Sequence, residues 1–120
     1  TIEGSIYATG SGNFNQSDRR LKEEIKEIPS EESLQTILDL KPVSFRFKKF
    51  PKTSHHGFIA QDVKESIGDS DWGVWSETDA GNGLKDGQFL NYEEIIADLV
   101  GSVKKLNERI EKLEEVIKGD

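Results

Sequence analysis

The 120-residue chain has no cysteine, no methionine, only three prolines and only two histidines. Without cysteine it can form neither a disulfide nor a thiolate metal site. His55 and His56 are adjacent, so on a strand they would point to opposite faces and could not hold one metal ion together. The glycines show no phosphate-binding pattern, and we expect no metal and no cofactor. Because methionine is absent, Thr1 is not a translation start, and we expect the chain to be a piece of a longer polypeptide.

Long apolar runs are also missing. No segment approaches the ~20 residues that a membrane-spanning helix needs, and no signal-peptide pattern is present. The formal net charge of −7 repels nucleic-acid phosphates and anionic lipid headgroups. We therefore expect neither a nucleic-acid nor a membrane partner. Hydrophobic residues make up 33% of the chain, which indicates a thin core whose apolar surface is completed by partner chains.

The composition changes abruptly at Ser17. Residues 1–16 are rich in Gly, Ser, Thr and Asn, which predicts a short strand over 5–9 followed by a loop. Eight of the twelve residues from 17 to 28 are charged. We therefore expect an upstream segment, a globular domain and a C-terminal helix. The three predicted units are residues 1–16, 17–91 and 92–120.

The middle unit has the patterns of a small α+β domain with a few strands and short helices. Apolar spacing or alternation predicts helices over 21–28, 34–40 and 62–67, and strands over 43–48 and 55–61. Residues 68–87 have little periodicity and predict a long loop or a loose hairpin, which usually serves function or partner contact. Trp72 and Trp75 either anchor this loop or stack on a carbohydrate.

The C-terminal helix carries the clearest pattern. Apolar residues recur at spacings of three and four with no polar interruption: Ile96, Leu99, Val103, Leu106, Ile110, Leu113 and Ile117. These spacings are those of a coiled-coil seam, and they favour self-association over a helix docked on its own domain. Ile or Val at position a with Leu at position d favours two strands in an isolated coiled coil.

Ser17 permits two interpretations. A serine that begins a helix is usually an N-cap. Alternatively, Ser17 is a nucleophile and Lys22 is its general base, which requires a lysine that burial or nearby positive charge has made neutral. Positions 17 and 22 do not share a face of one continuous helix, so such a pair requires Ser17 on a turn that precedes Lys22.

Four segments occur in a particular order along the chain: SDRRLK at 17–22, LKPVSF at 40–45, HHGFIAQDV at 55–63 and NY at 91–92, directly before the leucine-patterned helix. Together they resemble the C-terminal intramolecular chaperone domain of bacteriophage tail spikes and fibres, peptidase family S74. The resemblance covers residues 17–117. A related domain also occurs in a eukaryotic membrane-bound transcription factor, so the resemblance does not fix a viral origin.

The resemblance implies a homotrimeric chaperone that promotes folding and trimerisation of an upstream fibre segment of the same polypeptide, with the C-terminal helices forming a trimeric coiled coil. It implies autoproteolysis between Gln16 and Ser17 by a single-turnover serine endopeptidase, with Ser17 and Lys22 as the catalytic dyad. His55 and Gln61 would be accessory residues that shape the site. The module would act in the host cytoplasm during virion assembly and be released from the mature tail.

Two other functions stay open. The chain could be a trimerisation module that does not cleave itself. It could also be a fibre-tip adhesin that binds carbohydrate through the loop at 68–87 and its two tryptophans.

Overall fold

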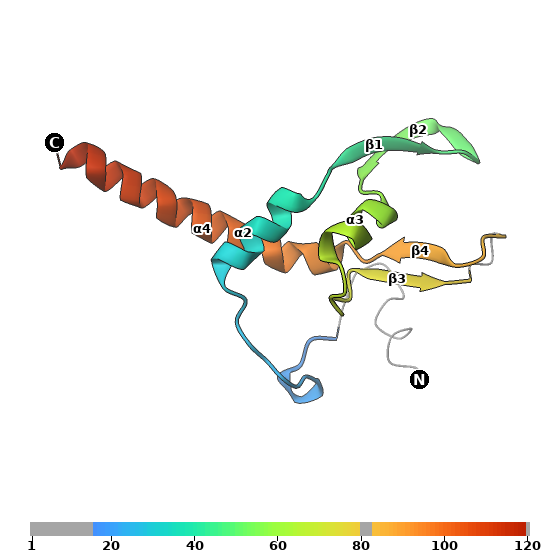
Figure 1. Ribbon diagram of the computed structural model, residues 1–120, viewed down its shortest axis with the longest axis horizontal. Coiled ribbons are helices and arrows are strands. Elements are labelled where there is room, and N and C mark those ends of the chain that lie inside the picture. Colours follow the sequence, from blue (N-terminus) through green and yellow to red (C-terminus); the bar gives the residue numbers. More distant parts are fainter. Residues whose placement is uncertain (1–15, 80–82, 120) are drawn as a thin grey trace.

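The computed structural model describes residues 16–79 and 83–119 (Figure 1). The elements in chain order are the 3-10 turn η1 (Arg19–Leu21), α2 (Ser30–Asp39), β1 (Val43–Phe47), β2 (Phe50–Gly57), α3 (Ala60–Ile67), β3 (Trp75–Thr78), β4 (Gly87–Leu90) and α4 (Glu93–Lys118). Within these ranges, three α-helices and two small sheets make an α+β fold, as the sequence predicts. The strand expected over 5–9 lies outside the described residues.

Both sheets are two-stranded antiparallel hairpins. In the first, a two-residue turn joins β1 to β2, Phe47 lies opposite Phe50, and the register shifts between Phe45 and Phe47. In the second, Trp75 of β3 lies opposite Leu90 of β4. A hairpin, rather than an irregular loop, is therefore the correct description of the segment that follows α3.

The prediction of a helix over 21–28 is wrong. Between η1 and α2 the chain forms neither helix nor strand, and Glu24 has a φ of 52°, which is incompatible with an α-helix. An eight-residue helix without a packing surface is only marginally stable in water. Glu23 and Glu27 would repel each other at a spacing of four, and Pro29 disfavours a helical conformation at Ile28. These local costs outweigh the apolar spacing.

The second strand lies earlier than predicted. It is expected over 55–61, whereas β2 starts at Phe50 and ends at Gly57, and α3 already begins at Ala60. The chain reverses at Lys48 and Lys49, so the polar residues after Pro51 already belong to the second strand, which is predicted to start only at His55. The strand predicted over 43–48 is confirmed as β1, but the turn that follows it lies directly at Lys48 and Lys49.

The hydrophobic core lies where α3, the β3–β4 hairpin and the start of α4 meet. Val63, Val74 and Ile95 are its buried members, with 0–4% of each exposed. Half-buried apolar residues close around them: Ile37, Leu40, Phe58, Ile67, Trp72, Trp75 and Leu90. In the described ranges Leu34 is the one other fully buried hydrophobic residue. The core is thin, as the composition indicates.

α2 packs along the first part of α4 (Figure 1). A Cβ atom added to Gly101 would lie 2.7 Å from Ser33 Oγ, so the two helices approach as closely as glycine allows. Ser33 Oγ donates a hydrogen bond of 3.0 Å to the buried Asp98 Oδ1. Ser102 Oγ donates to the Asp98 backbone carbonyl at 2.7 Å. A close polar contact therefore sets the position of α2 on α4.

Beyond Ser102, α4 extends away from the other elements of the domain up to its C-terminal end (Figure 1). The residues of the predicted seam are 46–73% exposed: Ile96, Leu99, Val103, Leu106, Ile110, Leu113 and Ile117. In a single chain they form an apolar stripe that faces water. None of the helices in the described ranges has the length and apolar character needed to cross a membrane.

Candidate active site

Ser17 and Lys22 lie in direct contact. Lys22 Nζ donates a hydrogen bond of 2.6 Å to Ser17 Oγ. Ser17 precedes η1, and Lys22 ends it as an extended C-cap residue with φ of −117° and ψ of 149°. The turn therefore folds the lysine back over the serine. This is the arrangement that the five-residue spacing requires if the two side chains are to meet.

Asp18 holds the turn that joins them. As the N-cap of η1, its Oδ1 accepts the Arg20 backbone N–H at 2.9 Å. The Arg20 guanidinium also donates to both carboxylate oxygens, at 2.8 and 3.1 Å. The side-chain hydrogen bond from Arg20, followed by the backbone one, lowers the pKa of Asp18 below its ordinary value. Asp18 therefore remains an ionised cap at neutral pH. By stabilising the turn, it allows the side chains of Ser17 and Lys22, five residues apart, to come into contact.

The Ser17–Lys22 pair is open to water. Both residues are exposed, and no ion pair to Lys22 occurs within residues 16–79 and 83–119. An amine can accept the serine proton only after it has lost its own, and removal from water favours that loss. Within residues 16–79 and 83–119, the chain provides the contact between the two groups but not the burial.

His55 and Gln61 do not reach this pair in the single chain. His55 lies on β2, where its ring stacks on Phe45 at 5.6 Å and meets the edge of Phe47 at 5.2 Å. Figure 1 shows the hairpin and the segment before α2 on opposite sides of the domain. Within the described residues of one chain, the structure therefore does not bring His55 to the Ser17–Lys22 pair.

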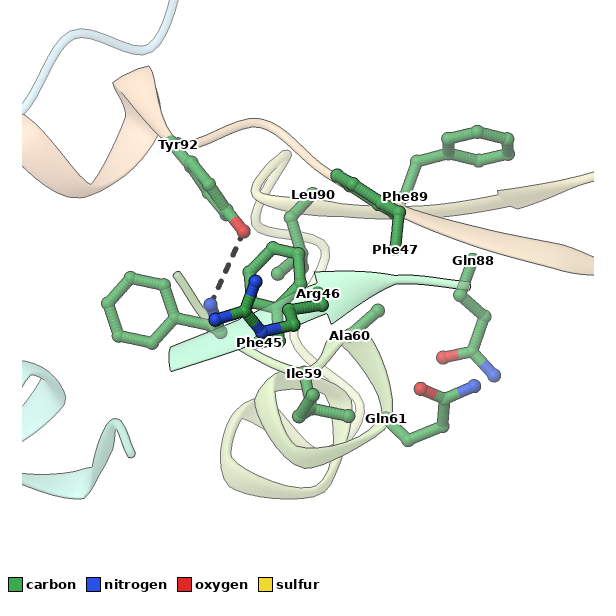
Figure 2. Close-up of a pocket in the computed structure, with 11 residues that line it drawn as sticks. Phe45, Arg46, Phe47, Ile59, Ala60, Gln61, Gln88, Phe89, Leu90 and Tyr92 are labelled. Atoms are coloured by element: carbon green, nitrogen blue, oxygen red, sulfur yellow. Dashed lines mark hydrogen bonds between the residues drawn. The ribbon is translucent and has the colours of Figure 1, made fainter. Parts of the chain in front are cut away.

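Gln61 instead lines an open hollow of about 580 Å³ between β1, the start of α3 and β4 (Figure 2). Most of its lining is aromatic or aliphatic, with Arg46, two glutamine amides and the Tyr92 hydroxyl as polar groups. The Gln88 amide is already engaged, since its Oε1 accepts the Trp75 indole N–H at 2.9 Å. No group of three His, Asp or Glu side chains that could hold a metal ion occurs in the part of the chain that the structure describes.

Gly57 and Tyr92 have a structural role that the sequence did not reveal. Tyr92 Oη accepts the Phe58 backbone N–H at 3.3 Å, and the two rings meet edge to face at 5.7 Å. A Cβ at Gly57 would lie 2.5 Å from Tyr92 Oη, so this close approach needs glycine. Asn91 Oδ1 accepts the Glu93 N–H at 3.2 Å at the start of α4. The HHGF and NY segments thus fasten the hairpin to the long helix.

Trp72 and Trp75 anchor the segment between α3 and α4. Trp72 Nε1 donates to Glu94 Oε1 at 3.1 Å, and Trp75 Nε1 donates to Gln88 Oε1 at 2.9 Å. Both rings pack against the core, and Lys64 Nζ lies 4.6 Å from the centre of the Trp75 ring. The anchoring interpretation is the correct one. Carbohydrate binding through these two side chains stays an untested alternative.

Residues 17–71 match the family model Peptidase_S74, described as "Chaperone of endosialidase". Residues 17–71 belong to the Peptidase_S74 family. The match begins at Ser17, where the composition changes, and it includes the Ser17–Lys22 pair, α2, the β1–β2 hairpin and α3. Peptidase_S74 is a family of self-cleaving peptidases, and the family description indicates an intramolecular chaperone role. The resemblance seen in the sequence is therefore confirmed.

A curated protein that is similar to the chain reaches beyond this Peptidase_S74 segment. Myelin gene regulatory factor-like A of Dictyostelium discoideum is 20% identical over 125 residues, which cover 94% of the chain. Because so much of the chain is covered, the similarity extends past residue 71 and into α4. The chain spans only 13% of the length of that protein.

Proposed function

We propose that the chain is a homotrimeric intramolecular chaperone module that promotes folding and trimerisation of a fibre segment upstream on the same polypeptide. It then releases itself by cutting the bond between Gln16 and Ser17. The observation that carries this proposal is the 2.6 Å hydrogen bond from Lys22 Nζ to Ser17 Oγ, immediately after the bond to be cut. The Peptidase_S74 match supports it, because self-cleavage is the activity of that family.

The reaction begins when the deprotonated Lys22 amine takes the hydroxyl proton of Ser17. Ser17 Oγ attacks the carbonyl carbon of Gln16 through a five-membered transition state, for which proximity supplies much of the acceleration. The bond from that carbon to the Ser17 nitrogen breaks as the Lys22 ammonium returns the proton to the nitrogen. Water then hydrolyses the resulting ester, which leaves a Gln16 carboxylate and a new N-terminal Ser17.

Assembly provides the burial of Ser17 and Lys22 that the described part of one chain does not. The exposed stripe of α4, with Leu106 at its centre, is the surface through which three parallel helices associate. A C-terminal clamp of this kind raises the effective concentration of three upstream strands before they pair, which offsets part of the entropy lost on pairing. A neighbouring chain then covers Lys22, so that cutting follows correct assembly.

Cleavage makes the product persist. Once the module has been removed, the assembled fibre can no longer unfold reversibly through its own folding nucleus, so its lifetime is set by a kinetic barrier. The partners are two further copies and the upstream segment. The module acts in the host cytoplasm during virion assembly and is released from the mature tail.

One observation favours a second function. Ser17 and Lys22 are exposed, and if no surface covers them the module is a trimerisation clamp that keeps its Gln16–Ser17 bond. The two functions differ in the mass of the assembled chain.

Purification of the wild-type chain, Ser17→Ala and Lys22→Ala, followed by intact-mass measurement over several days, tests the proposal. We expect a fragment that begins at Ser17 from the wild type and none from either variant. Lys26→Ala is the matched control, because it removes a nearby exposed lysine that does not contact Ser17, and it should cleave as the wild type does. Cleavage of the Lys22→Ala chain at the wild-type rate would refute the dyad. An uncut wild-type trimer would establish the non-cleaving clamp.

A further inference from the structure

The acidic arm, residues 23–32, runs from Lys22 into the first turn of α2. It contains five glutamates and one lysine, a net charge of −4. None of these glutamates forms an ion pair within the described ranges. Ile25 and Ile28 are 54% and 51% exposed, although isoleucine is among the residues most often buried. The acidic arm therefore presents charge and apolar surface that residues 16–79 and 83–119 of its own chain leave exposed.

The β1–β2 hairpin, residues 43–57, has the opposite charge. It contains one arginine, three lysines and no acidic residue, a net charge of +4 in a chain whose total is −7. None of these cations forms an ion pair in the part of the chain that the structure describes. The Arg46 guanidinium donates instead to the Pro51 carbonyl at 2.9 Å, within the hairpin itself. The hairpin is thus a concentrated basic surface without a counter-charge.

The tip of the hairpin is also apolar. Phe47 and Phe50 face each other across the strands and are 53% and 70% exposed. With Lys48, Lys49 and Leu84 they line an open hollow of about 750 Å³. A segment that combines branched aliphatic side chains with carboxylates is complementary to this hollow. Such a segment would bury apolar area and neutralise lysines at the same time.

The acidic arm of the same chain does not fill this hollow. Figure 1 shows the arm and the tip of the hairpin on opposite sides of the domain, with α3 and the helices between them. Two complementary but different surfaces on opposite sides of one molecule make a head-to-tail contact, which closes into a ring when the rotation between copies allows it. A parallel three-helix seam would fix such a rotation.

We propose that the acidic arm of each copy docks on the β1–β2 hairpin of the next copy, with Ile25 and Ile28 against Phe47 and Phe50. This inference rests on the proposed trimer and extends it. Since the acidic arm begins directly after Lys22, docking in trans holds the Ser17–Lys22 pair against the neighbouring chain. The contact thereby supplies cover that the described residues of one chain do not provide.

The absence of cysteine allows a direct test by cross-linking. Chains with Ile28→Cys are co-expressed with chains that carry Phe50→Cys, both with Ser17→Ala so that the arm stays attached to residues 1–16. A short thiol-reactive cross-linker should join the two kinds of chain. The matched control pairs Ile28→Cys with Asp69→Cys, an exposed position after α3, and should give at least tenfold less product. Equal yields from the two pairs would overturn the proposal.

Charge reversal tests the electrostatic part. In the cross-linking pair, Glu23→Lys with Glu27→Lys in the arm, or Lys48→Glu with Lys49→Glu in the hairpin, should each lower the yield at least tenfold. Both reversals together should restore it. If both together leave the yield as low as one alone, charge complementarity is refuted.

Sedimentation of the same samples separates this proposal from the proposed function. A trimer that gives no cross-link between Ile28→Cys and Phe50→Cys refutes docking of the arm but leaves the chaperone module intact. A chain that sediments as a monomer refutes both.

Discussion

The two halves of α4 have the same apolar spacing but different surroundings. In the inner half, residues 93–102, Ile95, Asp98 and Ser102 are 4–6% exposed and face the core or α2. The outer half, residues 103–118, has no buried residue. The inner half completes the domain, and the outer half offers an apolar stripe to another chain.

The difference teaches that docking and self-association need not compete for one face. Ile95 and Ile96 are neighbours about 100° apart on the helix, and only the first is buried, with Ile96 57% exposed. The docked stripe and the seam stripe both recur at three and four, but they are offset by one residue. The spacing of residues along the helix therefore cannot by itself distinguish the docked stripe from the seam stripe. Small and polar residues mark the docked stripe, which holds Asp98 and Ser102, and branched aliphatic residues mark the seam.

The largest effect is expected from a charge in the outer half. Leu106→Asp places a carboxylate in the centre of the proposed seam in every copy, and a buried unpaired charge is strongly destabilising. We expect loss of the trimer at micromolar concentration and loss of cleavage, while the domain stays folded. Asn107→Asp adds the same charge at the next position, outside the seam, and should leave the trimer intact. Sedimentation velocity and intact mass measure both outcomes, and equal cleavage by the two variants would break the link between assembly and cutting.

The next largest effect is expected from one of two substitutions at neighbouring positions in the inner half. Ile95→Ala removes a core side chain and should lower the free energy of unfolding by about 2–5 kcal/mol. Ile96→Ala should change it by no more than about 0.5 kcal/mol in the isolated domain, because this side chain is exposed. Urea denaturation with Leu106→Asp present in both proteins keeps assembly out of the measurement. Similar losses for both variants would show that α4 has a single apolar face.

A substitution at the contact between α2 and α4 should change the free energy of unfolding by a smaller amount. The sign of that change shows whether the two helices approach closely. Gly101→Ala brings a Cβ to 2.7 Å from Ser33 Oγ and 2.8 Å from Ser33 Cβ. Such overpacking should cost about 1–3 kcal/mol in the free energy of unfolding. At an uncrowded helical position the same change would stabilise by about 1 kcal/mol. A gain in urea resistance would therefore contradict the close approach of the helices.

The smallest effect concerns the exposed surface of the outer half. A hydrogen bond of 3.1 Å from Lys112, and the charge of Lys105, lower the pKa of Glu108 below its ordinary value of 4.5. Because the folded pKa is depressed, the stabilisation is present above the ordinary pKa and disappears as the pH falls through the folded value. Circular dichroism at low salt should show slightly more helix in the wild type than in Lys112→Gln at pH 7, and no difference at pH 2. A difference that persists at pH 2 would exclude the ion pair as its cause.

Much of the fold could be predicted because some segments have long or strict patterns. α4 repeats its apolar spacing over several turns, and β1 alternates between faces, so both lie close to their predicted ranges. The segment over 21–28 failed because two short repeats of apolar spacing resemble a helix, whereas helix formation there depends on a packing surface that the chain does not provide. The second strand begins earlier than predicted because nothing in Lys48 and Lys49 signals a turn.

The candidate site also has one part that could be predicted from the sequence and one part that could not. The spacing of Ser17 and Lys22 indicates that the two side chains can meet only if a turn lies between them, and the structure contains that turn and the contact. Their catalytic role stays a prediction. The roles of Gly57 and Tyr92 could not be derived, because they depend on a contact between residues 35 positions apart in the chain. What covers Lys22 cannot be read from one chain if the cover belongs to another.

The most direct test of the account is the molar mass of the uncut chain in solution. Sedimentation equilibrium of Ser17→Ala at micromolar concentration should give three times the mass of one chain, because the exposed seam of α4 then has its partners. A mass of one chain would contradict the account, since neither the clamp nor the cover over Ser17 and Lys22 would exist. A mass of two chains would show that the seam obeys the preference of an isolated coiled coil, and would contradict the proposed trimer.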